Sequence, residues 1–190
     1  MYFEEVSDGM FEPDDDYQSD IENNVILAKE GDKEAFISIM EKYKVDLYRM
    51  GRTILDSDDD IGDAMQETVL KAYKSLKNLK NLHSFKTWLI KIMVNECNNI
   101  LRSRKKVLFL DKVFHKEESY IDDYNFDKQP VLQAVKKLEL KFREPILLYY
   151  YEDLSVKEIS KCLDISEGTV KSRLSRARNK LFQLLKEVQE

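Results

Sequence analysis

A group of basic and hydroxyl side chains near the C-terminus has the types and spacing that DNA recognition uses. Five cations fall within ten residues, at Lys171, Arg173, Arg176, Arg178 and Lys180. Basic side chains neutralise phosphates and release counterions, and the amides at a helix N-terminus donate hydrogen bonds to phosphate oxygens. The pattern indicates a DNA-binding helix, although the charge alone is equally compatible with a solvated basic helix that closes a small bundle.

Two short helices joined by a tight turn, over residues 153–178, would position these side chains. Ser155 and Glu158 have the spacing of a capping box, and Ser166 is placed to cap the second helix. Asp164 falls at the turn, where aspartate tolerates a left-handed backbone. The expected inward positions are Val156, Ile159 and Leu163 in the first helix and Val170, Leu174, Ala177 and Leu181 in the second. This is helix-turn-helix spacing, which predicts that the second helix lies in a DNA major groove.

A second polar face occurs on a predicted helix in the middle of the chain. Asn95, Asn98, Asn99 and Arg102 recur at i, i+3, i+4 and i+7, and residues 102–106 hold four cations. Asparagines are poor for helix stability, but Asn and Arg are the side chains that best read base edges. Taken alone, this face favours nucleic acid only modestly.

A third face lies on the helix that follows the acidic run Ser57–Asp60. Asp63, Gln66, Glu67 and Leu70 share one side of this helix. The face is either plain solvated surface or a docking face for a partner's helices, with Leu70 as its apolar anchor.

Composition favours a helical protein without catalytic machinery. The 190 residues suffice for one or two small domains, and five glycines and three prolines leave few helix breaks. We find no phosphate loop, nucleophile elbow, metal-ligand spacing or catalytic carboxylate pair, so we expect no enzyme activity, cofactor, metal or small-molecule substrate. The isolated Cys97 and Cys162 predict reduced core thiols, and the absence of a signal peptide or a long apolar run predicts a cytoplasmic protein.

The net charge of −5 is unevenly distributed along the chain. Residues 1–28 hold nine acidic and no basic residues, which leaves 27 acidic against 31 basic residues in the remainder. An acidic average is therefore compatible with a nucleic-acid partner. The acidic N-terminus is either a solubilising tail or a self-inhibitory mimic of nucleic acid.

These patterns predict an all-α chain of two small helical domains joined by a flexible linker. Residues 1–23 are predicted to be a disordered extension, 24–107 the first domain, 108–128 an acidic linker and 129–190 the second domain. Within them we expect one helix over 25–55, another from the acidic run to about Leu76, and a helix that begins at Pro145.

Together, the motifs resemble the small extracytoplasmic-function group of bacterial RNA polymerase sigma factors. Asp63–Tyr73 is similar to the D-A-x-Q-E-x-F-x-K/R-A-Y/W run of sigma region two. Phe85–Asn95, followed by Asn99, is similar to F-x-x-W-L-x-x-I-A-x-N-x-x-x-D. Leu154–Ser160 and Ile165–Arg178 resemble the L-S-x-x-E-I-A and I-S-x-G-T-V-K-S-R-L-x-R-A-R runs of region four. The region-four match alone would admit other regulators, whereas both matches in this order favour a sigma factor.

Several positions depart from the family pattern. Val69 replaces an aromatic residue, Met93 and Ser160 replace alanines, Asn99 replaces an aspartate, Asp164 a glycine and Glu139 a proline. Of these residues only Asn99 lies on the expected DNA face. Its difference from the family pattern therefore bears on promoter specificity.

The resemblance implies a role for each face. The Asp63, Gln66, Glu67 and Leu70 face would bind the clamp helices of core RNA polymerase. The minus-ten promoter element would be held by the loop Lys77–Ser84, where a flipped base is captured, and by Asn95, Asn98, Asn99, Arg102, Arg104 and Lys105. The minus-35 element would be read by Gly168, Thr169, Lys171, Ser172, Ser175 and Arg176, while Arg173 and Arg178 would serve phosphates or intramolecular pairs. Members of the group are usually held inactive by an anti-sigma protein, often membrane-bound.

Two alternative functions remain open from the sequence. One is a two-domain transcriptional regulator that binds duplex DNA without polymerase, and the other is an antagonist that copies sigma surfaces. A regulator of that kind would not account for the faces at Asp63–Leu70 and Asn95–Arg102. The antagonist has no need of Lys171, Ser172 and Arg176.

Overall fold

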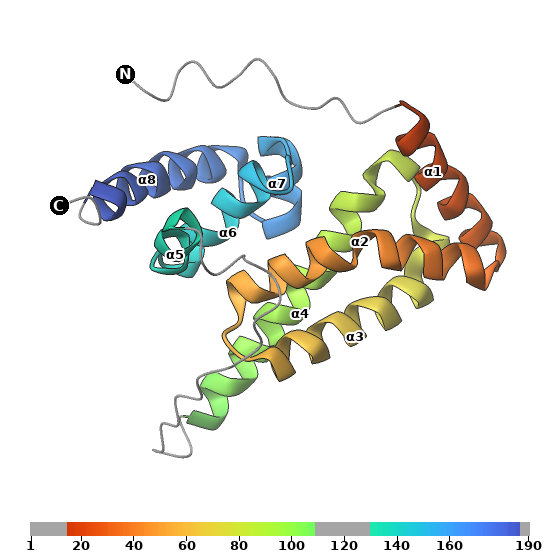
Figure 1. Cartoon of the computed structure of the whole chain (residues 1–190), viewed down its shortest axis with the longest axis horizontal. Helices are drawn as coiled ribbons and strands as arrows, with labels where there is room; N and C mark the ends of the chain where they lie inside the picture. The colour runs from red at the N-terminus through yellow and green to blue at the C-terminus, as the bar shows by residue number, and fades with distance from the viewer. Residues whose placement is uncertain (1–14, 109–129, 187–190) are drawn as a thin grey trace.

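The computed structural model describes residues 15–108 and 130–186, and these ranges are helical throughout apart from short turns. The elements are α1 (Asp15–Glu30), α2 (Lys33–Ile54), α3 (Asp58–Ser75), η1 (Leu76–Asn78), η2 (Leu82–Ser84), α4 (Phe85–Leu108), α5 (Pro130–Lys136), α6 (Leu140–Tyr150), α7 (Val156–Leu163) and α8 (Glu167–Lys186). We call α1–α4 the first unit and α5–α8 the second unit (Figure 1). The all-α fold class is confirmed, while the predictions for residues 1–14 and for the linker beyond Leu108 lie outside the described residues.

The N-terminal part of the first unit differs from two predictions. The single helix expected over 25–55 is two helices, because Gly31 ends α1 with φ of +110° and Asp32 caps α2. The Asp32 carboxylate accepts hydrogen bonds from the amides of Glu34 at 2.9 Å and Ala35 at 3.1 Å. Residues 15–23, expected to be disordered, belong to α1. The Gly-Asp pair is a helix stop and start signal that the continuous apolar stripe concealed.

Helix α1 is anchored by a short apolar stripe within its acidic sequence. Ile21, Val25 and Ala28 are buried, and their spacing of four and three is the helical signal that the acidic composition hid. In the last turn of α1, the Lys29 ammonium donates a hydrogen bond to the Leu79 carbonyl at 2.6 Å. The Glu22 carboxylate lies 2.5 Å from Nδ1 of His83. Helix α1 therefore braces the turns η1 and η2 that precede α4.

Helices α2, α3 and α4 form the core of the first unit. The predicted α2 stripe is confirmed, since all of its members are buried: Phe36, Ile39, Met40, Tyr43, Leu47, Met50 and Ile54. At Gly51, side chains of α3 and α4 pack directly against the backbone of α2. A Cβ at this position would lie 2.8 Å from Met93 Cε and 2.9 Å from Ile61 Cγ2. Only glycine allows α2 to approach α3 and α4 this closely.

The second unit corrects one boundary. Helix α6 begins at Leu140, so Pro145 lies inside the helix and does not start it. The amides of Phe142 and Arg143 already donate to the Glu139 carbonyl at 2.8 and 3.0 Å, which begins the helix before the proline. Proline lacks an N–H, so the helix forgoes the one hydrogen bond that would reach back to Lys141.

Arg143 ties the second unit together and connects it to the first. Its guanidinium donates from Nε and Nη2 to the Leu138 carbonyl at 3.2 and 2.9 Å, and from Nη2 to the Lys136 carbonyl. Its Nη1 donates to the Thr53 carbonyl of α2 at 2.9 Å. Burial lowers the pKa of this guanidinium, and nearby Asp56 opposes the shift. One side chain therefore satisfies carbonyls at the ends of two separate helices.

The two units pack directly on each other, with α7 against α4 and α6 against α2 (Figure 1). Polar contacts follow α4 along its length. Lys86 donates to the Glu152 carbonyl at 2.8 Å, Thr87 to the Glu158 carboxylate at 3.0 Å and Lys91 to the Lys161 carbonyl at 2.6 Å. Asn98 donates to the Glu144 carboxylate at 3.0 Å. We call this contact the inter-unit interface, and no local sequence pattern predicted it.

Candidate polymerase and nucleic-acid interfaces

The helix-turn-helix geometry matches the sequence prediction closely. Ser155 and Glu158 form a capping box at the start of α7. Asp164 has the left-handed backbone expected at the turn, with φ of 54° and ψ of 46°. The Ser166 hydroxyl accepts a hydrogen bond from the Thr169 amide at 3.1 Å and so caps α8. Val170, Leu174 and Ala177 are buried as expected, and in α7 it is Ile159 and Cys162 that are fully buried.

The turn residue offers a stability test. Asp164 adopts a conformation in which a Cβ costs about 1–2 kcal/mol, somewhat less for aspartate. We expect Asp164→Gly to raise the free energy of unfolding by about 0.5–1 kcal/mol, and Asp164→Val to lower it by more than that. Urea denaturation at fixed pH measures both changes. A destabilised glycine variant would contradict the assigned role of the turn.

The outward side of α8 presents most of the residues predicted for minus-35 contact. Gly168, Lys171, Ser172, Ser175 and Arg176 are exposed. Thr169 is half-buried, with its hydroxyl 2.8 Å from that of Ser166. A Cβ on Gly168 would meet only the Ser166 hydroxyl, at 3.9 Å, so nothing in the described chain requires glycine there. Because Gly168 has no side chain, the backbone at the N-terminus of α8 is open to solvent on this side.

Two of the basic residues on α8 have intramolecular roles. The Lys180 ammonium lies 2.7 Å from the Glu139 carboxylate and 4.8 Å from the Phe142 ring centroid. Hydrogen bonds from Lys141 and Lys180 lower the pKa of Glu139 to about 2. Arg173 is half-buried and acts electrostatically on Glu144. The charges available to a DNA backbone are therefore concentrated at Lys171, Arg176 and Arg178.

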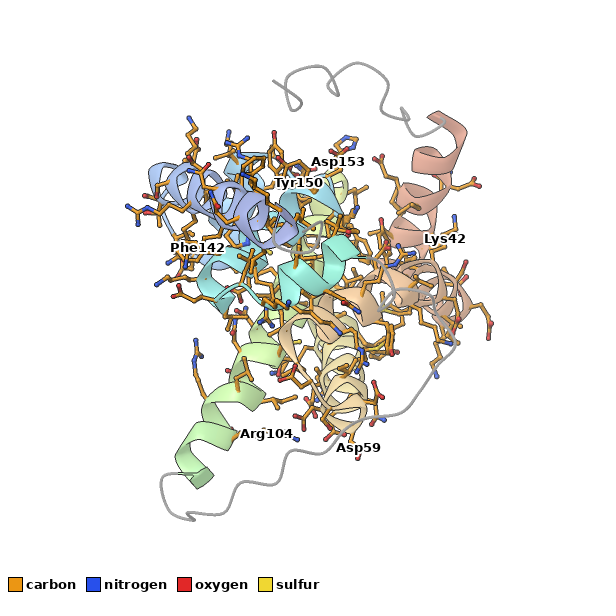
Figure 2. The ribbon with its side chains drawn as sticks, turned by 60° about the vertical axis from the view of Figure 1, so that its left-hand side comes forward. Lys42, Asp59, Arg104, Phe142, Tyr150 and Asp153 are labelled. Carbon is orange, nitrogen blue, oxygen red and sulfur yellow. The ribbon has the colours of Figure 1, made fainter. Side chains whose placement is uncertain are left out.

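On α4 the structure separates the predicted minus-ten residues into two groups. Asn95, Asn99 and Arg102 are exposed, and Arg102 donates to Asn99 Oδ1 at 3.3 Å. Asn98 is half-buried because its amide donates to Glu144 of the second unit. Arg104 is exposed and lies 2.7 Å from the Asp60 carboxylate, near Asp59 at the start of α3 (Figure 2). The side chain of Lys105 lies outside the described residues.

The loop predicted to capture a base is folded into η1 and η2. Asn81 caps η2 by accepting a hydrogen bond from the His83 amide at 3.1 Å. Leu76 and Leu79 are buried, whereas Lys77, Asn78, Lys80 and Asn81 are exposed. Together with the brace from Lys29, this fixes the backbone of the loop and leaves its polar side chains in solvent. Lys29 and Glu22 were not among the predicted site residues.

The face predicted for polymerase is a ridge on α3 between two hollows. Asp63, Gln66, Glu67 and Leu70 are all exposed. An apolar groove of about 410 Å³ runs between α2 and α3, lined by Met40, Glu41, Lys44, Leu47, Met65, Gln66, Val69 and Leu70. A hollow of about 290 Å³ with four carboxylates lies on the other side, lined by Asp60, Asp63, Ala64, Glu67, Glu96, Asn99, Ile100, Ser103 and Arg104. The ridge therefore offers an apolar contact on one flank and negative charge on the other.

Two carboxylates are buried at the inter-unit interface. Burial raises the pKa of Glu152 to about 7, and its Oε2 lies 3.3 Å from the Lys86 ammonium. The same ammonium donates a hydrogen bond to the Glu152 main-chain carbonyl at 2.8 Å, and its charge opposes the rise in the pKa of the carboxyl. Burial also raises the pKa of Glu144, against the hydrogen bond from Asn98.

Both cysteines are buried free thiols, as predicted. Burial raises the pKa of each to about 12, so neither is a thiolate at neutral pH. Within residues 15–108 and 130–186, no group of three or more metal-binding side chains is present. None of the helices described is long and apolar enough to cross a membrane.

Comparison with known proteins places both units in one family. Residues 39–107 match the family model of sigma-70 region 2, and residues 128–181 match that of sigma-70 region 4. The chain is 33% identical over 128 residues to RNA polymerase sigma factor SigZ of Bacillus subtilis, covering 66% of this chain and 72% of that protein. It is 28% identical over 183 residues to the ECF RNA polymerase sigma factor SigW of Bacillus subtilis, covering 88% of this chain and 98% of SigW.

A solved structure agrees with these matches. The co-crystal structure of the sigma factor RpoE with the anti-sigma factor NepR from Bartonella quintana is similar with a TM-score of 0.71 at 27% identity. That similarity covers 80% of this chain and 96% of RpoE. With its two sigma regions in this order, the chain belongs to the extracytoplasmic-function sigma factors of the sigma-70 family.

Proposed function

We propose that this sigma factor binds core RNA polymerase through the α3 ridge and directs initiation at promoters that it recognises through α8 and α4. The observation that carries the proposal is the exposure of three separate polar faces, each of which lies in a segment that matches a sigma-70 family model. In these terms residues 15–107 form the polymerase and minus-ten unit, 108–128 the linker and 129–190 the minus-35 unit. Polymerase and genomic DNA share the bacterial cytoplasm, where we infer that the protein acts.

The α8 face has the chemistry that reads a duplex minus-35 element. Lys171 and Arg176 supply donors for base edges or phosphates, and Ser172 and Ser175 supply hydroxyls on the same side. The amides at the N-terminus of α8, beside Gly168, would donate to a phosphate.

The minus-ten element would be bound as separated strands. Asn95, Asn99 and Arg102 present amide and guanidinium groups, and the loop at 77–84 would hold a flipped base. Unpairing a base costs a few kcal/mol, which stacking and phosphate contacts offset. Melting would thus be promoted by capture of the unpaired strand.

The α3 ridge has the composition of a helix-docking site. Leu70 is 49% exposed and borders the apolar groove, while Asp63 and Glu67 border the acidic hollow. An exposed apolar anchor flanked by charge is typical of an interface with basic or amphipathic helices. We also infer an anti-sigma partner, supported by the likeness to a sigma factor crystallised with one.

Reconstitution with bacterial core polymerase and genomic DNA fragments, followed by sequencing of the transcripts, tests the proposal. We expect start sites that share two upstream elements. Binding to duplex DNA without any polymerase binding would instead indicate a stand-alone regulator.

Arg176→Ala tests the assignment of α8. Loss of a base contact is expected to cost about 1–3 kcal/mol at the minus-35 element, roughly a 5- to 160-fold loss of affinity at matched salt. Arg178→Ala is the matched control, because a phosphate contact weakens binding to all sequences alike and lowers the salt slope by about one. Equal affinities of Arg176→Ala and the parent chain, measured by fluorescence anisotropy, would remove Arg176 from the DNA face.

A further inference from the structure

Three charged side chains of the second unit converge on one buried aromatic ring. The Glu139 carboxylate lies 2.7 Å from the Lys141 ammonium through Oε2 and 2.7 Å from the Lys180 ammonium through Oε1. Both ammoniums also lie over the ring of Phe142, at 5.0 and 4.8 Å from its centroid. Phe142 is only 5% exposed, so its ring is a fixed floor beneath the two positive charges. We call Lys141, Lys180 and Phe142 the paired-lysine site.

The paired-lysine site holds an anion through two of its oxygens. The two ammoniums come from different helices, α6 and α8, and each takes one oxygen of the same carboxylate. Hydrogen bonds from both lysines lower the pKa of Glu139 to about 2, so this carboxylate is ionised at neutral pH. Glu139 is the N-cap residue of α6, where the helix dipole also favours an anion, yet its carboxylate makes no capping hydrogen bond. A backbone phosphate presents the same kind of charge and the same pair of oxygens.

The site is open to solvent although its floor is buried. The side chains of Lys141, Lys180 and Glu139 are 55%, 48% and 53% exposed. Exposed ion pairs contribute little to stability, because water competes for both charges. A phosphate can therefore displace the carboxylate without any movement of the helices.

The position of Lys180 on α8 places the site beside the DNA that α8 would read. Lys180 follows Arg176 by four residues and shares its side of the helix. Lys180 lies roughly 18 Å along the helix axis from Gly168, at about 1.5 Å per residue. The N-terminal residues of a recognition helix contact base edges, and the major groove is only about 12 Å wide between its phosphates. Lys180 is therefore at the end of α8 where the helix leaves the bases and passes the backbone.

We propose that the paired-lysine site binds a backbone phosphate at the edge of the minus-35 element, and that Glu139 occupies the site until DNA displaces it. The inference rests on the proposed function of α8. Glu139 then lowers the affinity for every duplex alike, because a phosphate contact carries no sequence information. The family pattern has an uncharged proline at this position, so the competing carboxylate is a feature of this chain.

Removal of the carboxylate is expected to strengthen DNA binding. Glu139→Gln in the full chain should raise the affinity for a promoter duplex and for a scrambled duplex by the same factor, about three- to tenfold at low salt. Glu139→Pro should act alike, since φ at this residue is −58°, which proline adopts. Fluorescence anisotropy of labelled duplexes measures both changes. Asp153→Asn is the matched control, because it removes an exposed carboxylate from the turn between α6 and α7 and should leave the affinity close to that of the parent chain.

Lys141→Ala and Lys180→Ala test the site itself. Each variant should weaken binding to both duplexes several-fold and lower the salt slope by about one, with the fold checked by circular dichroism. When both lysines are replaced, adding Glu139→Gln should have no further effect. An equal gain from Glu139→Gln with and without the lysines would show a general effect of charge and overturn the proposal. Unchanged salt slopes of both lysine variants would overturn it as well.

Acetylation of lysine amines, followed by mass spectrometry, locates the contact directly. The promoter duplex should protect Lys141 and Lys180 together with Lys171, whereas Lys33 at the start of α2 should stay reactive. Protection of Lys171 alone would overturn the paired-lysine site and leave the proposed function intact. If the duplex protects none of the three, the assignment of α8 fails, and the phosphate site fails with it.

Discussion

Charge reversal at Glu67 is expected to abolish binding to core RNA polymerase without affecting the fold. Glu67 lies exposed on the α3 ridge beside Asp63, at a hollow whose other carboxylates, Asp60 and Glu96, are paired with Arg104 and Lys71. A lysine there would replace an attraction to a basic partner helix with repulsion at the centre of the interface. Central interface charges typically cost about 2–4 kcal/mol or more when disrupted, so we expect a loss of affinity of at least about 30-fold.

Competition for core polymerase with a labelled sigma factor measures this loss, and circular dichroism melting reports the fold. Glu67→Gln should lose less, because it keeps the shape and one acceptor. Glu30→Lys is the control, since it places a cation at the C-terminus of α1, where the helix dipole favours it. Parent-level affinity of Glu67→Lys would remove the α3 ridge as the polymerase site.

The largest stability effect is expected from Arg143→Ala. The guanidinium donates hydrogen bonds to the carbonyls of Lys136, Leu138 and Thr53. Hydrogen bonds from charged donors contribute about 1.5–3 kcal/mol each, and their loss leaves sheltered carbonyls without a donor. Because water can replace part of the network, we expect the free energy of unfolding to fall by about 3 kcal/mol.

Urea denaturation of the full chain at pH 7 measures this change. Arg143→Lys should recover only part of the loss, because an ammonium cannot reproduce the planar fork that serves several carbonyls at once. Arg178→Ala, an exposed arginine of α8, should change stability by less than about 0.5 kcal/mol. A loss below 1 kcal/mol for Arg143→Ala would show that its hydrogen bonds contribute little.

The features that the sequence predicted best are those set by local rules. The cap residues Ser155 and Ser166, the left-handed Asp164 and the stripe of α2 all depend on neighbours within a few positions along the chain. The exposed Asp63–Leu70 face also depends on local sequence alone, because its residues recur with the period of an α-helix.

The features that were missed depend on tertiary contacts or on competing local signals. Nothing around Asn98 indicates that Glu144, 46 residues away, accepts its hydrogen bond. The sequence predicts a helix start at Pro145 because proline is favoured there, but the turn that begins at Glu139 extends the helix ahead of the proline. The disorder expected for residues 15–23 came from average charge, which outweighed a three-residue apolar stripe.

Helix α1 has a practical consequence for dissecting this protein. The family model begins matching at residue 39, after α1 and the first turn of α2. A recombinant fragment cut at that point would uncover the apolar side of α2 and remove Lys29 from the Leu79 carbonyl. The loop proposed to capture a base would lose this contact with α1, so weak promoter opening by such a fragment would be a consequence of the missing helix. Fragments that begin at residue 15 keep the loop held as it is in the intact chain.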